Sequence, residues 1–113
     1  MTVRLLHESL AGGRWSEMSL VEQMANIGSE VGRAARAKEA GNDTRSWAAL
    51  ERALELFDLT IADDRSRGPR RREICRVREV VCDFLVGHNQ YGSTAASLDA
   101  YFLPYAMAAR RDR

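Results

Sequence analysis

The chain has 113 residues, enough for one domain, and is almost neutral, with 17 Lys and Arg against 16 Asp and Glu. Its hydrophobic fraction of 45% is that of a globular protein and excludes a wholly disordered chain. No apolar run approaches the roughly 20 residues that a membrane-spanning helix needs. The N-terminus also lacks the continuous apolar stretch of a secretory signal, so we expect a cytoplasmic protein.

The first predicted helix begins at Ser19, because Ser19 and Glu22 have the spacing of a capping box. Apolar side chains then recur at helical spacing until Gly41 ends the pattern. Residues 1–14 are predicted to be an arm, and residues 15–113 the helical domain. Small residues beside the apolar stripe would let a neighbouring helix approach closely; they are Ala25, Gly28 and Gly32.

The second predicted helix is apolar on two sides and starts at Asp43 or Thr44. Its core stripe repeats at spacings of three and four residues, as the a and d positions of a coiled coil do. This stripe consists of Trp47, Leu50, Leu54, Phe57 and Ile61. Leu56 and Leu59 fall on the other side, where a single chain would expose them. We therefore expect the protein to form oligomers through Leu56 and Leu59.

Two further helices complete the predicted fold. Pro69 suits the first position of the third helix, and Thr94 or Ser97 can cap the fourth. Pro104 is expected to kink the fourth helix or to start it afresh, because proline removes a backbone donor. Four helices with short connections favour an all-α fold, an up-down-up-down four-helix bundle.

Positive charge is concentrated in the second half of the chain. Residues 1–64 contain 7 Lys and Arg against 11 Asp and Glu, whereas residues 65–113 contain 10 against 5. All but one of the cations are Arg. This bias indicates either contacts of guanidinium groups with phosphates and carboxylates or the composition of a GC-rich genome.

In an up-down bundle, the start of the third helix and the end of the fourth lie at the same end of the molecule. The arginines there are therefore predicted to form an Arg-rich end that contacts a partner. They are Arg65, Arg67, Arg70, Arg71, Arg110 and Arg111. The partner is either a protein, including a second copy of the chain, or RNA or DNA. A solvated rim of ion pairs within the helices is the alternative.

No catalytic, cofactor or metal site is predicted. Glu51, Glu55 and Asp58 share one flank of the second helix, but the Glu-x-x-His pairs of carboxylate metal sites are missing. Cys75 and Cys82 are seven residues apart on one predicted helix, about 10.5 Å, which is too far for a disulfide. We expect a non-enzymatic accessory or scaffold protein without cofactors, and the alternative is a nucleic-acid-binding bundle.

Several stretches resemble a family of short, uncharacterised bacterial and archaeal proteins. The resemblance covers about Trp15–Arg111 and implies a helical bundle, without any catalytic residue. It rests on SLVEQMANIGSEVGRA (Ser19–Ala34), ALERALELFDLTIADDR (Ala49–Arg65), REICRVREVVCDFLVGHNQYGST (Arg72–Thr94) and YFLPYAMAAR (Tyr101–Arg110).

In size and helix count, the chain is also similar to two other groups of small helical proteins. One is the four-helix proteins encoded in ribosomal RNA intervening sequences, and the other is the accessory proteins of diversity-generating retroelements. This likeness of architecture implies ring-like oligomers with basic surfaces that work beside RNA or a reverse transcriptase.

Overall fold

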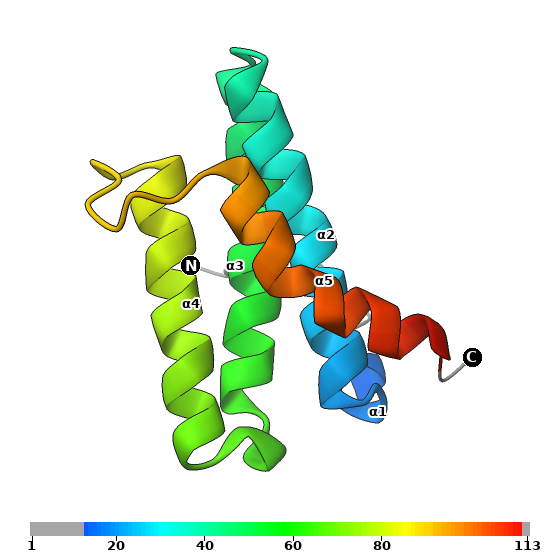
Figure 1. The fold of residues 1–113 in the computed structure, drawn as a ribbon. Helices are drawn as coiled ribbons and strands as arrows, with labels where there is room; N and C mark the ends of the chain where they lie inside the picture. The colour runs from blue at the N-terminus through cyan, green and yellow to red at the C-terminus, as the bar shows by residue number, and fades with distance from the viewer. Residues whose placement is uncertain (1–12, 112–113) are drawn as a thin grey trace, which may run out of the picture.

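The computed structural model describes residues 13–111, and within this range the chain is all-helical, with four long helices packed together (Figure 1). The elements are α1 (Trp15–Glu17), α2 (Leu20–Glu39), α3 (Asp43–Ala62), the 3-10 turn η2 (Asp64–Ser66), α4 (Pro69–Leu85) and α5 (Ala95–Arg111). None of the helices in the described range is long and apolar enough to cross a membrane. The predicted arm, residues 1–14, lies outside the described residues except for its last two.

Local sequence signals determine where the helices begin. Ser19 and Glu22 form the predicted capping box, in which each side chain accepts a hydrogen bond of 3.1 Å from the other residue's backbone N–H. Asn42 caps α3, one residue earlier than predicted, because its side chain accepts a bond of 3.0 Å from the Arg45 N–H. Pro69 is the first residue of α4, as predicted. These signals act within one helical turn, so they can be read without knowing the fold.

The other long helices are arranged around α2 (Figure 1). Its most extensive contacts are with α3, which runs antiparallel beside it, and with α5, which crosses it obliquely. Helix α4 packs along α3, and Tyr101 of α5 donates a hydrogen bond of 3.2 Å to Glu73 of α4. Pro104 lies inside α5 without ending it, and Figure 1 shows that the axis of this helix curves.

Helix α5 approaches α2 most closely at Gly28. A Cβ atom added to Gly28 would lie 2.7 Å from the Cβ of Phe102, a separation too short for two carbon atoms. Any larger residue would therefore push α5 away from α2. The predicted close approach at the small residues of α2 is confirmed for Gly28, whereas a Cβ at Gly32 would meet the side chain of Arg36 on its own helix.

The core includes a leucine that we predicted to be exposed. Leu56 is 3% exposed and belongs to the same buried cluster as Trp15 and Phe57. It is therefore not available as a subunit contact, and Leu59 is half-buried against the same core. Trp47, which we predicted to be buried, is 54% exposed. The predictions for Leu56 and Trp47 were wrong because the buried side of α3 faces both α2 and α4, not one coiled-coil partner.

Buried polar side chains join α1, α2 and the end of α3. The carboxylate of Asp63 accepts hydrogen bonds from the Arg65 guanidinium, the shortest 2.6 Å, and from Gln23 at 3.3 Å. Gln23 also donates to the Trp15 carbonyl at 2.8 Å, and the Trp15 indole donates to Thr60 at 3.0 Å. The hydrogen bonds from Arg65 hold the pKa of Asp63 well below its usual range.

The position of Leu56 can be tested by mutation. We expect Leu56→Ala to lower the free energy of unfolding by about 2–5 kcal/mol, because it leaves a cavity in the core. Trp47→Ala removes a larger side chain but should cost less than about 1 kcal/mol, because that side chain is largely in water. Urea unfolding followed by circular dichroism measures both. A larger loss of unfolding free energy for Trp47→Ala than for Leu56→Ala would show that α3 follows the coiled-coil register.

The role of Asp63 can be tested by changing the pH. We expect Asp63→Asn to lower the free energy of unfolding at pH 7 by about 1–3 kcal/mol, because hydrogen bonds to a charged group are weakened. The lowered pKa means that the stabilisation is present above the unfolded pKa of about 3.9 and is lost as the pH falls through the folded value.

Wild-type protein should therefore lose stability below about pH 4 more steeply than the Asp63→Asn variant. Asp64→Asn is the matched control, because this neighbouring carboxylate is well exposed. Urea titrations between about pH 7 and pH 3 would measure the slopes, and the same slope for wild type and Asp63→Asn would contradict the assignment.

Candidate anion-binding groove

The six arginines of the predicted Arg-rich end do not come together. Arg110 and Arg111 are exposed in the last turn of α5, which points to the right in Figure 1, whereas α4 begins at the lower left. The reason is that α5 crosses α2 instead of lying along α4. The predicted Arg-rich end was therefore wrong as a single surface.

Two of these arginines are held by the fold. Arg65 pairs with Asp63 and also donates a hydrogen bond of 3.0 Å to the Ser16 carbonyl. Arg71 donates to the carbonyls of Ile61 at 2.9 Å and of Asp63 at 3.2 Å. Those carbonyls lie where α3 ends and would otherwise lack a helical partner. Both guanidinium groups are therefore used to connect the end of α3 to its neighbours.

The other two arginines at this end are exposed and separate. Arg67 lies 3.4 Å from Asp64, and both side chains are largely in water, where such a pair contributes little. Arg70 borders a hollow between α2, α4 and α5 that also contains Glu73 and Tyr105. Neither arginine converges with another free cation in the described part of the chain.

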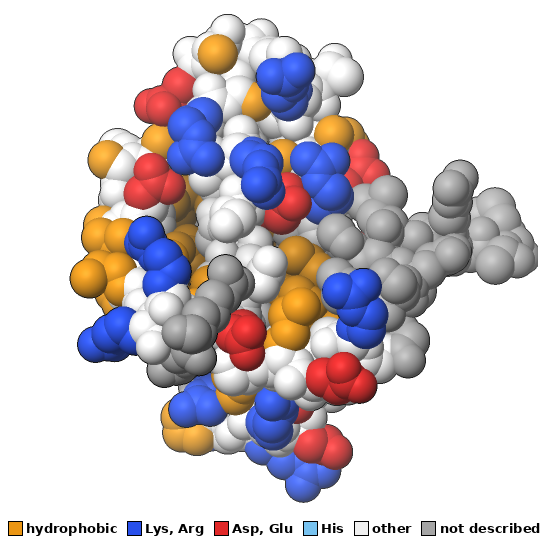
Figure 2. All heavy atoms as spheres, turned by 90° about the vertical axis from the view of Figure 1, so that its right-hand side faces the viewer, with side chains coloured by type: hydrophobic (Ala, Val, Ile, Leu, Met, Phe, Trp, Pro, Cys, Tyr) orange, Lys and Arg blue, Asp and Glu red, His pale blue; other side chains and the backbone are white. Residues whose placement is uncertain are grey.

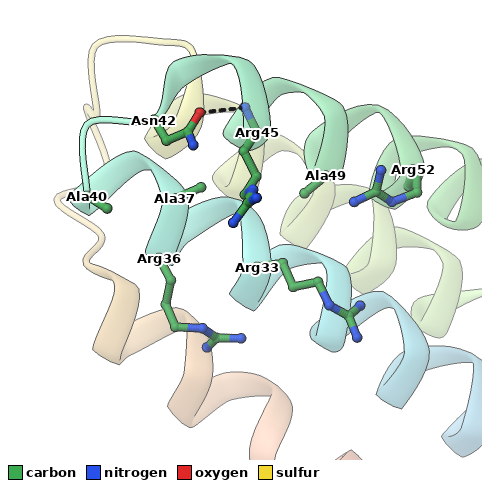
Figure 3. A pocket seen from close by; sticks show the side chains of 8 residues that line it. All are labelled: Arg33, Arg36, Ala37, Ala40, Asn42, Arg45, Ala49 and Arg52. Atoms are coloured by element: carbon green, nitrogen blue, oxygen red, sulfur yellow. Dashed lines mark hydrogen bonds between the residues drawn. The ribbon is translucent and has the colours of Figure 1, made fainter.

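A different set of arginines lines one groove between α2 and α3, which we call the arginine groove (Figure 3). It has a volume of about 500 Å³ and lies beside the turn that joins the two helices. Its lining residues are Arg33, Arg36, Ala37, Ala40, Asn42, Arg45, Ala49 and Arg52. Four guanidinium groups thus border a surface that is otherwise made of alanine and one asparagine.

Helical spacing brings the four arginines to the same side of the hairpin. Arg33 and Arg36 are one turn apart on α2, and Arg45 and Arg52 are two turns apart on α3. The short turn Ala40–Asn42 makes the two helices antiparallel neighbours, so their arginine-bearing sides meet. The signal that would have identified this groove is the spacing of arginines on both sides of one turn.

The arginine groove keeps a positive charge after its ion pairs are counted. One carboxylate, Glu30, lies 3.1 Å from both Arg33 and Arg52. Arg36 is 4.0 Å from Asp99, and both side chains are more than half exposed, so this contact is weak. Among the described residues, no carboxylate forms an ion pair with Arg45, whose side chain reaches from α3 over the groove in Figure 3.

The space-filling view shows the charged and hydrophobic side chains on this side of the molecule (Figure 2). In Figure 2, Lys and Arg side chains lie on the upper part of the face, where the upper halves of α2 and α3 are, and others lie on its middle and lower parts. Hydrophobic side chains gather on the α5 side of that face.

The geometry of the groove suits an extended anion. Guanidinium groups bind phosphate and carboxylate oxygens through two parallel hydrogen bonds. The four groups are spread along an open surface and remain in contact with water, so they can bind several oxygens in succession. A buried site for one small ion would need polar groups that converge on a single point.

The described residues contain no cluster that could hold a metal ion, and the two cysteines are free thiols. Within residues 13–111, no three His, Cys, Asp or Glu side chains come close enough to hold a metal ion. Cys75 is exposed and Cys82 is partly buried, and they are not bonded to each other. Burial raises the pKa of the Cys82 thiol, which disfavours the reactive thiolate. No protein-family model, curated protein or solved structure matches the chain.

Proposed function

We propose that the protein is a non-enzymatic, cytoplasmic helical protein that binds the phosphodiester backbone of nucleic acid through the arginine groove. The observation that supports this is the convergence of four guanidinium groups on one open surface that Glu30 and Asp99 neutralise only in part. Binding would derive mainly from the release of counterions from the phosphates. The likeness in size and helix count to accessory proteins of retroelements agrees with this role.

An acidic protein is the second candidate for the ligand, and the lining of the groove argues against it. Protein interfaces depend on a few aromatic or aliphatic side chains that fill pockets in the partner. Apart from arginine, the groove presents alanine and Asn42. A surface of charge without apolar anchors fits a phosphate backbone better than a folded protein.

Self-association in an up-down-up-down bundle is a separate part of the proposal. Its support is the outer side of α5, where Leu103 and Met107 are each about half exposed. No charged residue occurs between Asp99 and Arg110, so two copies of this face can meet without charge repulsion. Two copies of an arginine-bearing surface would instead repel each other. We infer that α5, and not Leu56 and Leu59, forms the contact between two copies.

Affinity measured as a function of salt tests the nucleic-acid proposal. Each neutralised phosphate adds about 0.7–0.9 to the slope of log affinity against log salt. Four guanidinium groups therefore predict a slope of about −3, which Arg45→Ala should reduce by about one unit. Fluorescence anisotropy with labelled RNA and DNA measures this.

The control for this experiment is Arg67→Ala. It removes the same charge from an exposed site outside the groove, so the slope should stay within experimental error of the wild type. No binding at low salt and micromolar protein would refute the nucleic-acid function. Equal effects of Arg45→Ala and Arg67→Ala would show that binding depends on overall charge and not on the groove.

Charged substitutions on α5 test whether this helix forms the contact between two copies. We expect Leu103→Glu combined with Met107→Glu to dissociate the oligomer, because two like charges would then face each other across the contact. The fold should be unaffected, since both side chains are about half exposed. Sedimentation or light scattering gives the mass, and circular dichroism monitors the fold. A monomeric wild type at micromolar concentration would exclude the contact.

A further inference from the structure

A second hollow also borders the α2–α3 hairpin, and we call it the Trp47 hollow. Its volume is about 290 Å³. It is lined by Lys38, Asp43, Ser46, Trp47, Leu50, Leu85 and Val86. The residues come from α2, α3 and the end of α4, so three segments of the chain hold its shape.

The linings of the two hollows contain residues that are neighbours in the sequence. Ala37 and Asn42 line the arginine groove, and the residues that follow them, Lys38 and Asp43, line the Trp47 hollow. A helix with its side chains is about 10–12 Å across, a distance that an extended strand covers in a few nucleotides. Gly41, at the tip of the turn, carries no side chain and has open space around it. A strand can therefore pass over the turn from one hollow to the other.

The Trp47 hollow has the properties of a binding site for a flat aromatic ring. Trp47 and Val86 are both more than half exposed, and buried Leu50 and Leu85 line the same hollow. Nucleobases stack on aromatic side chains whatever their sequence, because every base has a π-face. An indole that water reaches at the side of an apolar hollow can stack with such a ring without rearrangement of the fold.

The two charged residues of the hollow distinguish a base from a phosphate. The ammonium group of Lys38 is held 3.3 Å from the Leu85 carbonyl and 5.6 Å from the centre of the Phe84 ring, so a cation has a defined place there. The carboxylate of Asp43 would repel a phosphate inside the hollow, but it can accept a hydrogen bond from a base N–H. A base inside the hollow can donate a hydrogen bond to Asp43 while its phosphate lies near the ammonium group of Lys38.

We infer that the ligand of the arginine groove is single-stranded nucleic acid, one unpaired base of which stacks on Trp47. This inference rests on the proposed function of the groove. A duplex can place phosphates in the arginine groove, but its bases are paired and stacked inside and cannot present a face to Trp47. The arginine groove thus accounts for binding to any polyanion, and the Trp47 hollow accounts for the preference for a single strand.

The test compares three ligands on the full chain. They are a labelled single strand of about 12 nucleotides, as RNA and as DNA, a duplex of the same length, and inorganic polyphosphate. We expect Trp47→Ala to weaken binding of the single strand about tenfold, the loss expected for one base stack. Binding of the duplex and of polyphosphate should be unchanged, as should the salt dependence, because no phosphate contact is removed. The single strand that binds more tightly shows whether RNA or DNA is the preferred ligand.

Tryptophan fluorescence gives an independent measurement. Trp15 is buried in the core, so the change on adding an oligonucleotide should come from Trp47. We expect quenching of the wild type by the single strand, retention of most of the affinity in Trp47→Phe, and no quenching in Trp47→Ala. Tyr91→Ala is the matched control, because Tyr91 is equally exposed but borders neither hollow.

The outcomes separate this inference from the proposed function. Unchanged single-strand affinity in Trp47→Ala, or a wild type that binds duplex as tightly as single strand, would overturn the stacking site and leave the arginine groove in place. A wild type that binds none of the polyanions would overturn both.

Discussion

Small side chains on α2 and α3 decide how closely the helices pack, and the rest of the structure depends on this. Ala34 and Ala35 of α2 and Ala49 and Ala53 of α3 are almost completely buried. At Gly28, the side of α2 that faces α5 has no room even for a methyl group. Because α2 accepts a close neighbour on two sides, α5 crosses α2 and does not lie along α4. The predicted meeting of arginines from the starts and ends of these helices therefore does not occur.

Small residues also line the arginine groove, where Ala49 is joined by Ala37 and Ala40. Alanines on both helices leave a hollow that larger side chains would fill, and arginines one or two turns away border it. Some of these arginines also stabilise the fold: Arg33 and Arg52 share Glu30, and Arg36 lies in the last turn of α2, where a cation interacts favourably with the helix dipole. Among the described residues, Arg45 forms no ion pair, so its guanidinium group stays available at the surface of the groove.

Arginines at the two ends of α3 behave differently because their neighbours differ. At the C-terminal end, Asp63 and the last helical carbonyls bind Arg65 and Arg71, and the result is a connection between elements. At the N-terminal end, the Arg45 side chain has neither a carboxylate nor a helical carbonyl as a partner among residues 13–111. The density of arginine along the chain is therefore a poor guide to which guanidinium groups remain available, because tertiary partners decide this.

The sequence by itself determined the helices and their starts, since signals such as the capping box at Ser19 and the proline at position 69 act within a single turn. It also determined that α2 could accept a close neighbour at Gly28. Only the tertiary structure decided which side of α3 is buried, and so exchanged the expected roles of Leu56 and Trp47. Periodicity gives the direction of an apolar stripe, but the width of the buried surface depends on how many helices cover it. The arginine groove required the same knowledge, because it exists only where two helices meet.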